Sequence, residues 1–222
     1  MTLLKRFLPL LILTALQNVT YAQEESVQYD WKEKRNKEGI MIYTSKVPGS
    51  KYKAIRGSMV VKGNIHSLIA LVQDTSSCAE WADLCKESYI HKKISDTEYY
   101  VYSYNDIPFP VRDRDVLAHV TWKQNPETLT VSMTSKPLSG IVEKTKAIRI
   151  EEAISQWHFT PLEDGSTRVE TYAHINPNGA TPAWLTNMLL ISSPFKTMSN
   201  MRKKIEEGEY KDAKISFIQL DR

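Results

Sequence analysis

Histidine is the residue type here best suited to acid–base or metal chemistry. The chain holds five: His66, His91, His119, His158 and His174. None has metal-site spacing to another His or to Cys, and the sequence contains no H-E-x-x-H, G-x-S-x-G or P-loop motif. His119, His158 and His174 fall on separate predicted strands and could converge for general acid–base work, but hydrogen-bonded or solvent-facing histidines are commoner. We therefore predict no catalytic residue, no metal and no cofactor.

The first 22 residues predict a signal peptide. Lys5 and Arg6 form a short basic region, and residues 7–16 form an apolar stretch too short to span a bilayer. Ala22 is a small residue just before the expected cleavage site, and no Cys follows it. We expect an exported protein, periplasmic or secreted, with residues 23–222 forming one domain. An uncleaved anchor is the alternative, which the short apolar stretch disfavours.

Composition is that of an ordinary globular protein, with 41% hydrophobic and 25% charged residues. The formal net charge is +3, and removal of Lys5 and Arg6 leaves 27 basic against 26 acidic residues. A chain so close to neutrality gives no support for nucleic-acid binding, so we predict no nucleic-acid partner.

The two cysteines, Cys78 and Cys85, allow one disulfide. On a continuous helix, residues seven apart lie about 10.5 Å apart along the axis, beyond the roughly 7 Å limit on Cα separation for a disulfide. Either the helix ends between them and the pair bridges a turn, or the thiols stay free. We favour the bridge, because export favours oxidation.

Most of the chain predicts β-strands. Runs over residues 40–44 and 52–61 flank a Pro-Gly turn and predict an opening hairpin. A short helix is expected over residues 24–37, and another over residues 67–72 with Asn64 as its N-cap. Seven further strands are predicted, over residues 87–94, 98–104, 116–123, 128–135, 147–151, 154–160 and 168–175. This spacing favours an antiparallel meander.

A long amphipathic helix is predicted over residues 183–208, with Thr181 as N-cap, Pro182 in the first turn and a kink at Pro194. Its apolar residues recur at steps of three and four: Trp184, Leu185, Met188, Leu189, Ile191, Phe195, Met198, Met201 and Ile205. Such a face can pack on a solid core or cover a cavity, since Met adapts to both. Periodicity alone favours the solid core.

One local segment is distinctive: residues 107–115 place Pro108 and Pro110 around Phe109, and the pair Arg114–Asp115 follows. The prolines favour an extended loop, and an ion pair at the strand edge is more often structural than catalytic. This segment resembles the Pro-x-Pro…Arg-Asp signature of START domains, the steroidogenic-acute-regulatory-related lipid-transfer family.

The resemblance extends over residues 27–210. Residues 74–81, ending in Trp81, resemble the family's segment after its first internal helix. Arg149, Trp157 and residues 176–187 resemble family positions on the last strands and at the start of the C-terminal helix. The chain is most similar to exported bacterial single-domain members.

The resemblance implies an α+β helix-grip (START/Bet v 1-like) fold, in which an antiparallel sheet wraps around the C-terminal helix and encloses a hydrophobic cavity. The apolar helix face would then be a cavity wall, and residues 136–141 a candidate gate. The candidate cavity-lining residues are Trp184, Leu185, Met188, Leu189, Phe195, Met198, Tyr102 and Arg112.

By this resemblance, the chain binds a lipid-like molecule (sterol, phospholipid or fatty acyl chain) for transport or sensing outside the cytoplasm. It would act as a monomer, contact membrane surfaces transiently and catalyse no reaction. One alternative is a cyclase- or hydrolase-like enzyme of the same fold, acting on a hydrophobic substrate in the cavity. A filled core serving as an interaction module is a third interpretation.

Overall fold

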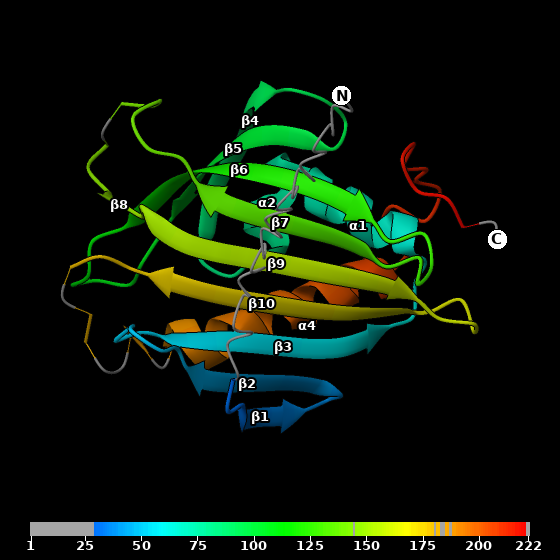
Figure 1. Ribbon diagram of the computed structural model, residues 1–222, viewed down its shortest axis with the longest axis horizontal. Coiled ribbons are helices and arrows are strands. Elements are labelled where there is room, and N and C mark those ends of the chain that lie inside the picture. Colours follow the sequence, from blue (N-terminus) through cyan, green and yellow to red (C-terminus); the bar gives the residue numbers. More distant parts are fainter. Residues whose placement is uncertain (1–28, 144, 180, 183–184, 187, 221–222) are drawn as a thin grey trace, which may run out of the picture.

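A ten-stranded sheet dominates the computed structural model, which describes residues 29–143, 145–179, 181–182, 185–186 and 188–220 (Figure 1). The strand order is β1-β2-β3-β10-β9-β7-β6-β5-β4, all antiparallel, and β8 pairs with β6 in parallel. The strands are β1 (Lys32–Lys37), β2 (Ile40–Lys46), β3 (Lys53–Val61), β4 (Cys85–Lys93), β5 (Glu98–Asn105), β6 (Arg114–Gln124), β7 (Val131–Pro137), β8 (Ile148–Arg149), β9 (Glu152–Pro161) and β10 (Thr167–Asn176).

The helices lie together on one face of this sheet (Figure 1). They are α1 (Ile65–Gln73), α2 (Cys78–Trp81) and α4 (Ser193–Glu206), which a π-helical turn, Met188–Ser192, precedes. The Asn64 side chain caps α1 as predicted, accepting a hydrogen bond from the Ser67 amide at 2.9 Å. Because the sheet curves around α4, the predicted α+β helix-grip fold is confirmed.

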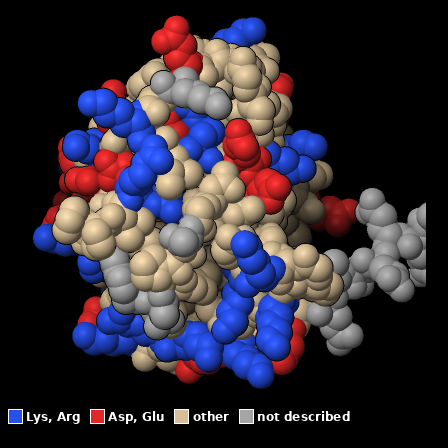
Figure 2. Space-filling model, turned by 90° about the vertical axis from the view of Figure 1, so that its left-hand side faces the viewer, with Lys and Arg blue, Asp and Glu red and all other residues tan. Residues whose placement is uncertain are grey.

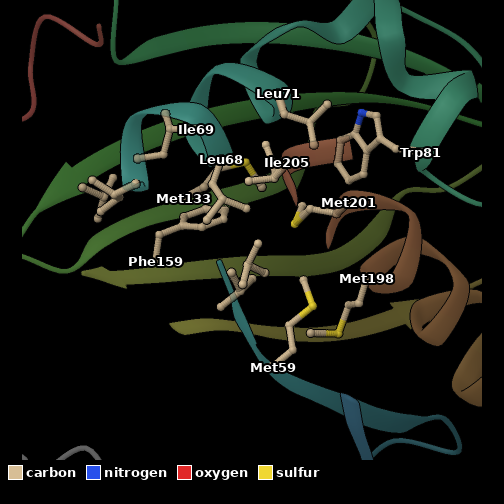
Figure 3. Close-up of a cluster of buried hydrophobic side chains, with 14 of the residues drawn as sticks. Met59, Leu68, Ile69, Leu71, Trp81, Met133, Phe159, Met198, Met201 and Ile205 are labelled. Carbon is tan, nitrogen blue, oxygen red and sulfur yellow. The ribbon is translucent and has the colours of Figure 1, made fainter. Parts of the chain in front are cut away.

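Helix α4 packs against the sheet through side chains spaced by three and four residues. Phe195, Met198, Met201 and Ile205 are buried, the two methionines completely. Figure 3 shows Met198, Met201 and Ile205 pointing toward residues of the sheet and of α1. The close approach of α4 to β3 needs a glycine at position 57, because a Cβ atom there would lie 2.6 Å from the Met198 Sδ.

The predicted C-terminal helix is confirmed over residues 188–206, although its geometry changes along its length. The predicted kink site, Pro194, lies in the first turn of α4, where the change from π- to α-helix occurs. Because the helical backbone continues before Pro194, the proline removes one helical hydrogen bond, and the helix geometry changes at this point. Part of the predicted first turns, residues 183–184 and 187, lies outside the described residues.

The predicted helix over residues 24–37 is wrong in its described part, where residues 32–37 form edge strand β1. Glu38 and Gly39 have φ angles of 55° and 71°, so the chain reverses in a two-residue turn and pairs β1 with β2. Residues 147–151 also differ from their prediction, since the strand there is limited to Ile148–Arg149 and is parallel to β6.

The cysteine pair forms the predicted disulfide. Helix α2 ends at Trp81 and Leu84 adopts a φ of 71°, so the chain turns back before β4. This turn brings the Cα atoms of Cys78 and Cys85 to 5.9 Å, within the range of a disulfide. Among the described helices, none combines the length and apolar character needed to cross a bilayer. The predicted signal peptide lies outside the described residues.

Candidate functional site

A cavity of about 720 Å³ lies between the sheet and the start of the C-terminal helical segment. This volume is typical of sites for small ligands. The cavity extends over β3, β6, β7, β9 and β10 on one side and over Leu185–Thr197 on the other. Its apolar wall includes Ile55, Val116, Ala118, Trp157, Ala173, Leu185 and Leu189.

The cavity exists because side-chain size changes along the strands. On β6, Val116 and Ala118 line the cavity, whereas Val120 and Trp122 fill the core further along. On β10, Ala173 lines the cavity and Val169 belongs to the core. The large side chains therefore pack one half of the space under the sheet (Figure 3), and the small ones leave the other half open.

The predicted helix residues divide between these two halves. Leu185 and Leu189 line the cavity, whereas Phe195 and Met198 belong to the packed core. Met188 is half-buried and is not among the described lining residues. Trp184 lies outside the described residues. Contact of Leu185 and Leu189 with a ligand stays a prediction.

Tyr102 and Arg112, the polar cavity candidates, belong instead to a network beside it. The Tyr102 hydroxyl donates to the buried Asp115 carboxylate at 3.1 Å, and Arg149 donates two hydrogen bonds to the same group at 2.7 and 2.8 Å. Burial and the Asp115 charge raise the pKa of Tyr102 to about 12. Arg112 is exposed and donates to the Lys146 carbonyl.

The Asp115 carboxylate stays charged despite its burial. Burial alone would raise its pKa, but hydrogen bonds from Arg149, Thr145 and Tyr102 outweigh that effect and hold the pKa below its usual value. The ion pair with Arg149 thus joins β6 to β8, which is the structural role expected for a charged residue at this strand edge.

Arg114 is the buried cation in the described cavity wall. Its guanidinium donates to the carbonyls of Pro177 at 3.1 Å, of Asn178 at 3.0 Å and of Arg112. Burial lowers its pKa, as does the nearby Arg112. Asn178 also donates to the Arg149 carbonyl at 2.8 Å. These contacts fix the segment that leads from β10 to the cavity-covering residues.

The three histidines considered for acid–base chemistry do not meet. Each bonds a separate partner: His119 with Glu98, His158 with Ser132 and His174 with Ser50, at 2.8 to 3.0 Å. No histidine is among the described residues that line the cavity. Within the same described part of the chain, no cluster of three His, Cys, Asp or Glu has the geometry to hold a metal ion.

Two loops with exposed apolar residues flank the cavity at one end of the sheet, the left in Figure 1 and the viewer's side in Figure 2. Phe109, between β5 and β6, is 94% exposed, and Ile141, after β7, is 50% exposed. The predicted gate, residues 136–141, begins within β7, where Pro137 lines the cavity. Its motion stays a prediction.

Comparison with known proteins agrees with this architecture. The crystal structure of a STAR-related lipid transfer protein fragment from Xanthomonas axonopodis is similar with a TM-score of 0.72 and 27% identity, covering 79% of this chain and 98% of that one. Human StAR-related lipid transfer protein 5 gives a TM-score of 0.71 over 80% of this chain and 86% of its own, and at 18% identity this likeness concerns the fold alone.

Sequence relatives extend the agreement. The uncharacterized protein PA1579 of Pseudomonas aeruginosa is 30% identical over 178 residues, which is 80% of this chain and 88% of the relative. The START domain model matches residues 12–209, nearly the whole chain. The chain therefore belongs to the START domain family.

Proposed function

We propose that the protein binds one lipid-like molecule in the cavity, shields it from water and carries or presents it outside the cytoplasm, without chemical turnover. The observation that supports this most directly is the apolar cavity of about 720 Å³ beside a fully packed core. The similarity to a STAR-related lipid transfer protein from Xanthomonas axonopodis points to the same class of ligand.

The apolar character of the cavity wall determines which kind of molecule the cavity can bind. Each buried methylene contributes about 0.8 kcal/mol, and association costs about 4–15 kcal/mol in lost freedom. A long acyl chain or a sterol body therefore suffices for useful affinity without any covalent step. The absence of histidine from the described lining residues favours a carrier over an acid–base enzyme.

Loading and release need contact with a membrane surface. Phe109 is held out by the flanking prolines and is 94% exposed, an arrangement suited to shallow insertion into the interface. Ile141 offers a second apolar contact from the neighbouring loop. We infer that a monomer approaches the bilayer with this end of the sheet, and that the signal peptide delivers the protein to a compartment outside the cytoplasm.

Native mass spectrometry of protein purified from the exported fraction, followed by solvent extraction, tests the proposal. A discrete adduct that is recovered as an unaltered sterol, phospholipid or fatty acid is the expected result. Protein that stays free of lipid after incubation with mixed liposomes would contradict it. A lipid recovered in chemically altered form would favour the enzyme alternative.

A cavity-blocking variant sharpens this experiment. Replacing Ala118 and Ala173 by Phe places two rings in the open half of the space, so lipid loading should fall strongly while the packed half is untouched. Ala79→Phe, on the exposed side of α2, is the matched control and should load like the parent. Equal loading of all three proteins would show that the ligand lies elsewhere.

A further inference from the structure

Charge is strongly segregated along this chain. Residues 32–62, which form β1 to β3, hold nine Lys and Arg but two Glu, a formal net charge of +7. The whole chain carries +3, so all other residues together carry −4. The near-neutral total conceals this asymmetry. Figure 2 shows Lys and Arg gathered along the lower part of the face at the cavity end, where β1 to β3 lie.

The turn between β2 and β3 concentrates this charge at the cavity. Lys51 and Lys53 line the cavity, and Lys46 lies directly opposite Lys53 in the strand pairing. All three are exposed, and within the described part of the chain none has a carboxylate within ion-pair distance. Like charges directly opposite each other destabilise an antiparallel pair, so this arrangement favours binding of an anion.

We propose that this lysine turn, Lys46, Lys51 and Lys53, docks the open end of the cavity onto an anionic lipid bilayer. The inference rests on the proposed function, because it assigns the charge of the membrane from which lipid is collected or to which it is delivered. Exposed lysines spread over a turn match the many phosphates of a surface better than one small anion, which requires converging donors.

The geometry also relates the lysine turn to the apolar loops. The β5–β6 loop, which holds Phe109, and the loop after β7, which holds Ile141, lie at the same end of the sheet as the turn (Figure 1). The lysine turn attracts this end of the protein to the anionic bilayer, and Phe109 then contacts the membrane interface. At the opposite end of the sheet, about 30 Å away along β3, Lys62 follows β3 and Lys123 lies near the end of β6. In the proposed orientation these two lysines face away from the bilayer.

Co-sedimentation with vesicles tests this inference in the full mature protein. Vesicles of phosphatidylcholine are compared with vesicles of phosphatidylcholine and phosphatidylglycerol in equal parts, at low and at high salt. The protein should bind the anionic vesicles, and salt should weaken this binding. Equal binding to both kinds of vesicle, or binding to neither, would overturn the inference.

Substitutions then locate the surface. Each lysine near an anionic surface contributes about fivefold to partitioning, so replacing Lys46, Lys51 and Lys53 by Gln should weaken binding about 100-fold. The control replaces Lys62, Lys123 and Lys214, exposed lysines at the opposite end, and should bind like the parent. If the two triple variants bind equally, the lysine turn is not the docking surface.

A single substitution separates docking from folding. Lys46→Glu faces Lys53 with an opposite charge, so the melting temperature should rise slightly while vesicle binding falls. A variant that bound less because it was damaged would instead melt lower. Lipid retained by all these variants in the extraction assay would show that the cavity still functions, so failure of docking is distinguishable from failure of lipid binding.

Discussion

The substitution Asp115→Asn tests the network around Asp115 and Arg149. This network holds residues 177–179, which lead from β10 to the helical residues that line the cavity. Asp115 is fully buried and accepts four hydrogen bonds, two of them from Arg149 at 2.7 and 2.8 Å. Asn keeps the shape of the side chain but presents an NH₂ group to donors and removes the charge. Arg149, whose side chain is 14% exposed, would then be a cation without its counter-ion.

Removal of one partner from a buried ion pair costs about 3–5 kcal/mol, because the remaining charge is uncompensated. Because Arg149 retains some contact with water, we expect a loss at the lower end of this range, about 3 kcal/mol in the free energy of unfolding. A total stability of about 5–15 kcal/mol makes this a large fraction. The Arg149 carbonyl also binds Asn178, so lipid loading should weaken as well.

Urea unfolding of the mature protein measures the loss. Glu170→Gln is the control, since it breaks an equally short but exposed pair with Arg56, and it should cost less than about 1 kcal/mol. Adding Arg149→Met to Asp115→Asn removes the unpaired cation and should recover at least about 1 kcal/mol. The reasoning fails if Asp115→Asn costs no more than Glu170→Gln, or if the double variant is the less stable one.

The same carboxylate predicts a pH dependence. The pKa of Asp115 is held below its usual value in the folded state. Its contribution to stability is therefore complete above the unfolded pKa of about 3.9 and disappears as pH falls through the lower folded value. The parent should lose stability on acidification below about pH 4 more steeply than Asp115→Asn. Parallel unfolding curves for the two proteins in that range would contradict this assignment.

Three further substitutions probe the packing, the disulfide and the exposed loop. Gly57→Ala should destabilise by about 1–3 kcal/mol, because the new Cβ would lie 2.6 Å from the Met198 Sδ, and Met198→Ala in the same chain should relieve part of that loss; unfolding by urea measures both. Replacing Cys78 and Cys85 by Ser should cost about 2.5 kcal/mol for so short a loop, and reduction of the parent should lower its melting temperature equally. Phe109→Asp should leave the melting temperature unchanged, since the ring is 94% exposed, and should slow lipid exchange with vesicles; unchanged exchange would show that this loop does not touch the bilayer.

Local patterns predicted most of the elements. The alternation along β10 and the three- and four-residue spacing of Phe195, Met198 and Met201 depend on neighbours within one element. For Cys78 and Cys85, the distance limit left a bridge across a turn or free thiols, and the expected export favoured the bridge that the structure shows. Edge strand β1 was mispredicted, because its polar residues carry no alternating pattern and its pairing depends on a partner strand and a two-residue turn.

The cavity was determined by contacts between elements. Leu189 and Met198 belong to the same apolar face, yet one lines the cavity and the other packs in the core, because of what the sheet presents opposite each. Ala118 and Ala173 line the open space together with Leu189, whereas Met198 lies against Gly57 and fills the space that this glycine leaves within the packed core. The sequence alone therefore determined an amphipathic helix, a set of strands and the family. Only the tertiary structure decided where side-chain volume runs short, because an open space depends on residues far apart in the chain.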